Sequence, residues 1–170
     1  MEMLVLLMGS NTGRREARLQ QALEAMGERI GPPICSSRIW ETQAWGGVAD
    51  GDFLNQAHRF EADVEVFRLL AILQEVEGVL GRTPSERWGN REIDIDILVY
   101  GSLCLRHESL NVPHLHLSTR RFALVPLHEV APEWSHPETG NTAAEMLPHC
   151  QDDSKVVPFE GSPQRSFSFK

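Results

Sequence analysis

The chain has 170 residues, of which 41% are hydrophobic and 24% are charged, so its length and composition fit a single globular domain. Its formal net charge of −8 excludes a general nucleic-acid binder, because such a protein needs a basic surface to hold the phosphate backbone. The three cysteines lie far apart and form no C-x-x-C pair, so we expect free thiols in the cytoplasm and neither a disulfide nor a zinc site.

The first half of the chain predicts a strand, a helix and two further strands, in that order. Residues 4–8 form a short apolar run without a basic leader. This run predicts a buried strand that ends at Gly9-Ser10-Asn11, and not a signal peptide or a membrane span. Residues 14–30 carry leucine and methionine at helical spacing, and residues 35–42 and 53–60 are each typical of a strand.

The second half predicts another helix and the last strand of the sheet. An apolar stripe from Leu69 to Leu80 indicates a helix, which we expect Asp63 to cap and Gly81 to end. Residues 93–100 alternate in the manner of a strand. The resulting order, β-α-β-β-α-β, is typical of a ferredoxin-like α+β sandwich with an antiparallel sheet.

The C-terminal part of the chain carries shorter elements. Residues 120–125 predict a short helix, and Thr142 and Glu145 match a capping box at the start of another. From residue 148 onward the chain is polar and has little apolar periodicity. We therefore expect one domain over residues 1–147 and a loosely ordered tail over residues 148–170.

Two aspartates stand on the predicted strand at residues 93–100, directly after an arginine-rich loop. Side chains alternate along a strand, so Asp94 and Asp96 share one face and lie roughly 7 Å apart. Paired carboxylates repel each other unless water or cations neutralise them, and Mg²⁺ takes one or two carboxylates together with phosphates. The pattern favours a site for a magnesium-bound polyphosphate, and the alternative is an edge strand with one solvated face.

A longer series of motifs surrounds this pair, over about residues 4–147. It comprises Gly9-Ser10-Asn11, Phe53-Leu54-Asn55, Gln74 with Glu77, Gly81-Arg82, Arg87-Trp88-Gly89, Arg91, Asp94-x-Asp96, Val112-Pro113-His114, Arg120-x-Phe122, and Pro126-Leu127-x-Glu129-x-Ala131-Pro132. In order and spacing, the series resembles the 6-hydroxymethyl-7,8-dihydropterin pyrophosphokinases of folate biosynthesis. The resemblance implies the same ferredoxin-like fold and the transfer of pyrophosphate from ATP to the reduced pterin, with release of AMP.

The resemblance also implies roles for individual residues. The catalytic set is Arg82, Arg91, Asp94 and Asp96, in which the two aspartates hold two Mg²⁺ ions. The ATP-binding set is Gln74, Glu77, Arg87, Trp88, Ile97, His114 and Arg120. The pterin-binding set is Thr42, Phe53, Asn55 and Phe122. A flat pterin needs aromatic faces for stacking and fixed hydrogen-bonding groups at its edge, which the pterin-binding set offers.

Some of these residues have a plainer alternative. Either phenylalanine alone is more typical of a hydrophobic core, and a lone Pro-His is more typical of a structural turn. For Glu77 the alternative is a solvated position on the helix. The chain also departs from the family pattern, because Gln43-Ala44-Trp45 stands where prolines are usual and Pro84 stands near the place of a second arginine. Both an aspartate and the metal remain candidates for lowering the pKa of the attacking hydroxyl.

ATP and the reduced pterin are the expected partners, with no nucleic acid, no membrane and no obligate protein partner. A diverged, noncatalytic member of the same fold that binds pterin or nucleotide is the alternative to an enzyme. Retention of the whole catalytic set argues against that alternative, since a sensor has no need of all four residues.

Overall fold

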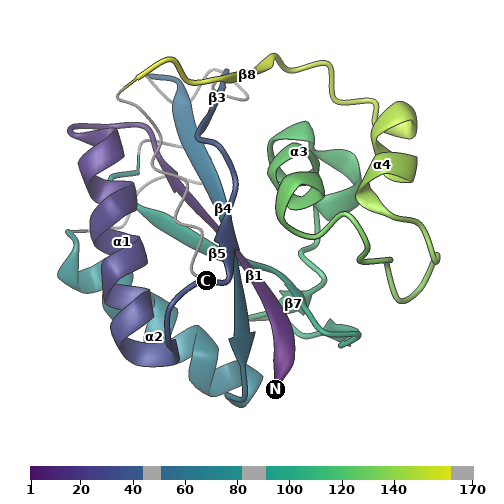
Figure 1. Ribbon diagram of the computed structural model, residues 1–170, viewed down its shortest axis with the longest axis horizontal. Coiled ribbons are helices and arrows are strands. Elements are labelled where there is room, and N and C mark those ends of the chain that lie inside the picture. Colours follow the sequence, from purple (N-terminus) through teal and green to yellow (C-terminus); the bar gives the residue numbers. More distant parts are fainter. Residues whose placement is uncertain (44–50, 82–90, 162–170) are drawn as a thin grey trace.

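The computed structural model describes residues 1–43, 51–81 and 91–161, which form an antiparallel sheet with helices on both faces (Figure 1). Over these residues the sheet has six strands in the order β5-β1-β4-β3-β8, with β2 also paired to β4. The strands are Glu2–Ser10 (β1), Cys35–Ser36 (β2), Trp40–Thr42 (β3), Phe53–Ala62 (β4), Asp94–Tyr100 (β5) and Val156–Pro158 (β8). The order β5-β1-β4-β3 is that of a ferredoxin-like sheet, so the predicted α+β fold is confirmed.

Helices α1 and α2 cover one face of the sheet, and α3 and α4 cover the other (Figure 1). The helices are Arg15–Ile30 (α1), Val66–Val79 (α2), Arg121–Val130 (α3) and Ala143–Met146 (α4). Between and after them lie the short strands Leu105–Arg106 (β6) and Asn111–Val112 (β7), and the 3-10 turns Leu117–Thr119 (η1) and Leu147–His149 (η2). Within the described ranges no helix combines the length and the apolar character needed to cross a membrane.

The hydrophobic core has two parts, one on each face of the sheet, and β1 contributes to both. Leu4, Leu6 and Met8 pack with α1 and α2, whereas Val5 and Leu7 pack with α3 and α4. A central strand that is buried on both faces reads as a continuous apolar run, which is why residues 4–8 could be assigned from sequence.

Several element boundaries differ from the sequence prediction. Asp63 does not cap α2; the cap is Glu65, whose carboxylate accepts hydrogen bonds from the Phe67 and Arg68 amides. The strand predicted at residues 35–42 is split into β2 and β3, and α3 continues through to Val130. The capping box at Thr142 and Glu145 is confirmed in both directions.

The C-terminal segment returns to the sheet. β8 pairs antiparallel with β3, so that Thr42 lies opposite Val156. Phe159 packs against the core on the α1 side, with the Arg15 guanidinium carbon 5.6 Å from the centroid of its ring. The predicted loosely ordered tail is therefore wrong as far as residue 161, and residues 162–170 lie outside the described part of the chain.

His58, on β4, makes the stability of this fold dependent on pH. Complete burial lowers the pKa of His58 to about 3, below the value of about 6.5 that it has in an unfolded chain. The contribution of His58 to stability is therefore fully present above about pH 6.5. It is lost as the pH falls, because the unfolded chain then binds a proton at this histidine and the native state does not. We expect the free energy of unfolding to fall between about pH 7 and pH 5, by up to about 1.4 kcal/mol per pH unit for one proton.

Chemical denaturation of the wild type and of His58→Leu across this pH range tests the expectation. The variant should lose the His58 contribution to the slope, and a dependence of similar size should remain because burial also lowers the pKa of His114, to about 4. His128→Gln, on the exposed side of α3, is the matched control. An equal slope in the wild type and in His58→Leu would contradict the assignment.

Candidate active site

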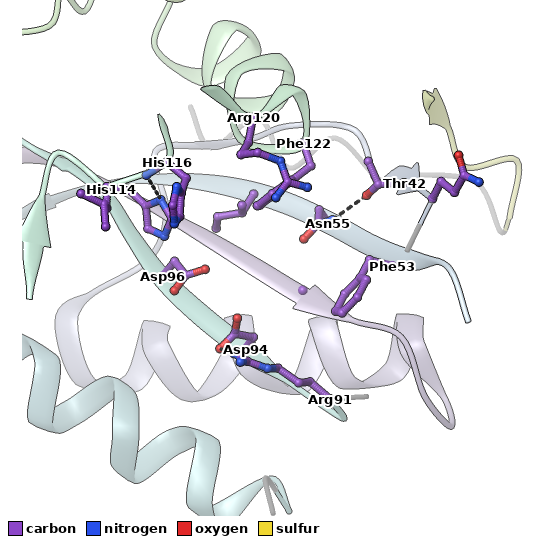
Figure 2. A pocket seen from close by; sticks show the side chains of 14 residues that line it. Thr42, Phe53, Asn55, Arg91, Asp94, Asp96, His114, His116, Arg120 and Phe122 are labelled. Carbon is purple, nitrogen blue, oxygen red and sulfur yellow. Dashed lines mark hydrogen bonds and ion pairs between the residues drawn. The ribbon is translucent and has the colours of Figure 1, made fainter. Parts of the chain in front are cut away.

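A cavity of about 320 Å³ lies over the sheet on the side of α3 and brings together most of the predicted site residues (Figure 2). This volume falls at the lower end of the range for small-molecule sites, roughly 300–1,000 Å³. The predicted residues in its wall are Thr42, Phe53, Asn55, Arg91, Asp94, Asp96, His114, Arg120 and Phe122. Residues as far apart in the sequence as Thr42 and Phe122 thus meet in one space.

The two aspartates occupy the face of β5 that lines this cavity. Asp94 lies opposite Gly9 and Asp96 opposite Leu7 in the pairing of β5 with β1, while Ile95 is buried in the core on the other face. β5 is an edge strand of the sheet, which agrees with one part of the alternative of a solvated edge strand. The carboxylates nevertheless point into a walled cavity and not onto an open surface, which favours a ligand site.

Arg91 lies just before the start of β5, and hydrogen bonds to its main chain hold it in place. The Arg91 amide donates to Asn11 Oδ1 at 2.6 Å, and the Asn11 amide donates to the Arg91 carbonyl at 3.1 Å. The Arg91 guanidinium in turn contacts Asp94, with 3.0 Å between Nη1 and Oδ1. Asn11 also donates to the Gly51 carbonyl at 3.2 Å, so it links the chain at Gly51 to the chain at Arg91. Sequence reasoning noted Asn11 only as part of a motif and missed this function.

The opposite end of the cavity suits a flat heterocycle with a polar edge. Asn55 donates from Nδ2 to the Thr42 hydroxyl at 2.8 Å, and both side chains are buried (Figure 2). Any side chain at Gly9 would bring a Cβ within 2.6 Å of Asn55 Oδ1, so glycine is needed there for the amide to fit. Phe53 and Phe122 are half-buried in the cavity wall, which leaves ring surface for stacking.

His114 and His116 border the cavity beside Asp96. Burial, followed by the nearby His116 and Arg120, lowers the pKa of His114 to about 4, although Asp94 acts in the opposite direction. His114 is therefore neutral at pH 7. Its Nδ1 accepts a hydrogen bond from the His116 amide at 3.2 Å, so the ring proton is assigned to Nε2. His114 thus offers a hydrogen-bond donor to a ligand instead of a positive charge. Sequence reasoning missed His116, for which the His-x-His spacing was the available signal.

The comparison with known proteins identifies the family. A family model described as 7,8-dihydro-6-hydroxymethylpterin-pyrophosphokinase (HPPK) matches residues 5–132. The 2-amino-4-hydroxy-6-hydroxymethyldihydropteridine pyrophosphokinase of Porphyromonas gingivalis is 37% identical over 142 residues, which are 81% of this chain and 96% of that protein. The enzyme of the same name from Aquifex aeolicus is 36% identical over 152 residues, or 89% and 92% of the two chains. The chain belongs to the HPPK family. Its activity is that of an ATP-dependent pyrophosphokinase in folate biosynthesis.

Solved structures agree with the HPPK fold. A crystal structure of HPPK-DHPS in complex with substrates matches 87% of this chain with a TM-score of 0.67 and 16% identity. The Plasmodium falciparum HPPK-DHPS with pteroate matches with a TM-score of 0.70 and 14% identity. This chain spans less than half of those chains, 43% and 42% respectively, and at such identities the likeness concerns the fold alone.

Three residues of the predicted ATP set do not line the cavity of this HPPK family member. Ile97 is 4% exposed and its side chain packs in the core on the α1 side, so its side chain is not available to ATP. Glu77 is buried, and its Oε1 accepts a hydrogen bond from the Ile95 amide at 2.7 Å. The solvated alternative for Glu77 is therefore wrong, and one of its roles is to support the strand that carries the aspartates. Gln74 is exposed on α2.

The remaining HPPK assignments fall on parts of the chain that the structure does not describe. Arg82 from the catalytic set and Arg87 and Trp88 from the ATP-binding set lie in residues 82–90. Pro84, one of the departures from the family pattern, lies there too, whereas Trp45 lies in residues 44–50. Of the departure at residues 43–45, only Gln43 is described, and it borders the cavity.

Proposed function

We propose that the cavity binds ATP at its carboxylate end and the reduced pterin at its Asn55 end, and that pyrophosphate passes between them. One observation carries the proposal: two carboxylates with an arginine beside them share a single cavity with a buried amide and two aromatic faces. The first group suits a metal-bound polyphosphate, and the second suits a flat ring with hydrogen-bonding edges. A single-substrate site has no need of both.

The donor set also fits two Mg²⁺ ions held by Asp94 and Asp96. Among the described residues no group of three or more potential metal-ligating side chains gathers at one point. Two neighbouring carboxylates without a third protein ligand suit Mg²⁺, which fills its remaining positions with substrate phosphates and water, better than zinc, which takes a closed set of protein ligands. When bound, Mg²⁺ neutralises the phosphate charge and aligns the reacting oxygens.

The protein groups then position the reactants. The pterin hydroxyl oxygen forms a bond to the β-phosphorus of ATP, and the bond from that phosphorus to the oxygen bridging to the α-phosphate breaks. AMP leaves with that oxygen, and the hydroxyl proton is released to solvent. Arg91 and Arg120 supply fixed positive charge to the phosphate oxygens, and neutral His114 donates a hydrogen bond. Such a site works by orientation and charge neutralisation, with no covalent enzyme intermediate.

The deciding experiment is an assay for AMP formation from ATP and Mg²⁺, with and without 6-hydroxymethyl-7,8-dihydropterin. We expect AMP and the pterin diphosphate to form together and only when the pterin is present. Binding of both ligands without AMP formation would instead favour the noncatalytic alternative.

We also propose a cytoplasmic location. Cys35, Cys104 and Cys150 are free thiols in the described structure, and free thiols persist in a reducing compartment. Fractionation of cells that express the tagged full-length chain tests this proposal, and recovery outside the cytoplasm would contradict it.

The Phe122→Ala variant tests the pterin end of the cavity. Because the ring should stack on the pterin in the ground state and the transition state alike, its loss should raise KM for the pterin more than it lowers kcat. The stacking contribution alone is about 0.5–1.5 kcal/mol, which corresponds to roughly a two- to tenfold rise in KM. Phe67→Ala, on the exposed side of α2, is the control for losing an aromatic side chain. A change in kcat with an unaltered KM would contradict the stacking role.

A further inference from the structure

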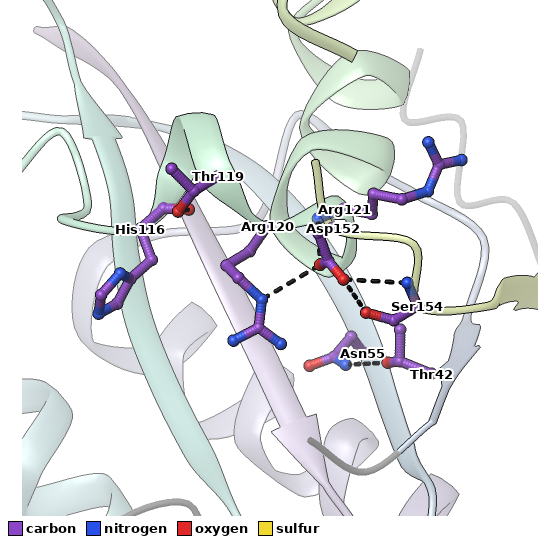
Figure 3. Close-up of polar contacts among 8 residues, drawn as sticks. All are labelled: Thr42, Asn55, His116, Thr119, Arg120, Arg121, Asp152 and Ser154. Atoms are coloured by element: carbon purple, nitrogen blue, oxygen red, sulfur yellow. Dashed lines mark hydrogen bonds and ion pairs between the residues drawn. The ribbon is translucent and has the colours of Figure 1, made fainter. Parts of the chain in front are cut away.

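Asp152, in the segment between η2 and β8, ties the C-terminal part of the chain to the wall of the cavity. Its Oδ2 atom accepts hydrogen bonds from Arg120 Nε at 3.1 Å and from the Arg121 amide at 2.9 Å. Its Oδ1 atom accepts from the Ser154 amide at 3.0 Å and from the Ser154 hydroxyl. Figure 3 shows these bonds converging on one carboxylate. None of the sequence motifs includes this residue.

The contact is an ion pair that is largely withdrawn from solvent. The Arg120 and Asp152 side chains are 11% and 8% exposed. Burial acts to raise the pKa of Asp152, but the hydrogen bonds from Ser154, Arg121 and Arg120 outweigh it and lower that pKa to about 2. Asp152 is therefore ionised at neutral pH. A charge-assisted bond in such surroundings fixes geometry more firmly than an exposed pair does.

The place of this bond on the guanidinium decides which atoms are presented to a ligand. Asp152 occupies the Nε edge, so the two terminal nitrogens of Arg120 point away from it (Figure 3), and Arg120 itself lines the cavity. On another side, the guanidinium carbon lies 4.9 Å from the centroid of the Phe122 ring. An arginine held by two such contacts loses less rotameric freedom when it binds an anion.

We propose that Asp152 is a positioning residue for the nucleotide, which holds Arg120 in the orientation that presents its terminal nitrogens to the phosphates of ATP. The inference rests on the proposed function for the identity of the ligand. Arg59 and Glu133 form a comparable ion pair away from the cavity, in which the glutamate is 58% exposed, so this second pair serves as a matched control.

The experiment measures, by calorimetry on the full chain, the binding of a nonhydrolysable ATP analogue with Mg²⁺. Asp152→Asn keeps the shape of the side chain but removes its charge, which by itself would favour binding of an anion. Loss of the fixed Arg120 orientation acts in the opposite direction and lowers the affinity. We expect this effect to be the larger one, so that binding weakens about three- to tenfold, the usual cost of ordering one long side chain on binding. Ser154→Ala, which removes one bond to the carboxylate, should weaken binding less, and Glu133→Gln should leave it unchanged.

A double-mutant cycle separates positioning from a general structural role. In an Arg120→Met background, Asp152→Asn should cause no further loss of analogue affinity, because Asp152 acts through Arg120. Wild-type or tighter binding of the analogue by both Asp152→Asn and Ser154→Ala would overturn the inference. Equal weakening of binding by Asp152→Asn in the wild-type and Arg120→Met backgrounds would overturn it too.

If Asp152→Asn does not fold, Ser154→Ala alone decides between the same two results. A wild-type chain that binds the analogue but forms no AMP would overturn the proposed function, whereas the binding data would still decide the role of Asp152.

Discussion

Replacing Asp96 with alanine is expected to lower kcat by about 10³-fold or more while the protein stays folded. The change removes one of two carboxylates that face the cavity, and a metal-bound phosphate loses a ligand at the point where charge shifts during transfer. The side chain does not belong to either part of the hydrophobic core, so the packing of β5 against the helices is retained. Loss of one carboxylate also relieves its repulsion with Asp94, so thermal stability in Mg²⁺-free buffer should be equal or slightly higher.

Steady-state kinetics at saturating Mg²⁺ and thermal denaturation in its absence test both parts of this expectation. Asp63→Ala, at an exposed position before α2, is the matched control and should keep its kcat. Near-normal turnover of Asp96→Ala at saturating Mg²⁺ would contradict the metal assignment. A large loss of thermal stability would contradict the claim that Asp96 serves the site and not the fold.

Replacing Arg91 with alanine is expected to lower kcat by about 10²-fold with little change in KM for the pterin. A guanidinium that meets the charge developing on the transferred phosphates acts mainly in the transition state, and losing one such donor typically costs about 10²–10³ in kcat. The main chain of Arg91 is held by Asn11 independently of its side chain, so the loop end should keep its position in the variant. Arg91→Lys keeps the charge but not the planar fork and should recover only part of the activity.

Kinetics that vary ATP and pterin separately test this prediction, with the exposed Arg68→Ala on α2 as the control. An effect confined to the KM for pterin would show that Arg91 contributes to ground-state binding of that substrate instead. Asp94 bears on the interpretation, because it is 3.0 Å from the guanidinium and loses this partner in the variant. A cycle of the wild type, Arg91→Ala, Asp94→Asn and the double variant reveals how far the two effects are coupled.

Much of this site could be predicted because its signals are local or occur in a fixed order. The alternation Ile-Asp-Ile-Asp assigns the two faces of β5 directly, and Asp94 and Asp96 do line the cavity. The motif series likewise named Asn55, Phe53 and Phe122, which the fold brings to the opposite end of the same space. Ile97 shows where the family resemblance fails as a guide to side chains. The resemblance assigned Ile97 to ATP binding, but the alternation along β5 already assigned its side chain to the core face, where the structure places it.

Supporting contacts could not be predicted, because they join residues far apart in the chain. Asn11 holds Arg91 across 80 positions, and Asp152 holds Arg120 across 32. No local periodicity marks such a pair, and a polar residue in a weakly patterned segment looks the same whether it is solvated or bound. Glu77 illustrates the same difficulty on a helix, since only the approach of β5 turns it from a surface residue into a buried acceptor.

The sequence by itself determined the main strands and helices of the sandwich, the paired carboxylates and the family, since each depends on residue types at short spacing or in a fixed order. Only the tertiary structure decided that residues 156–158 pair with β3, that Asp152 binds Arg120, and that burial lowers the pKa of His114 to about 4. The physical reason is common to all three. Burial and its effect on charge arise from the packing of distant segments, and that packing is a property of the whole fold and not of any local stretch.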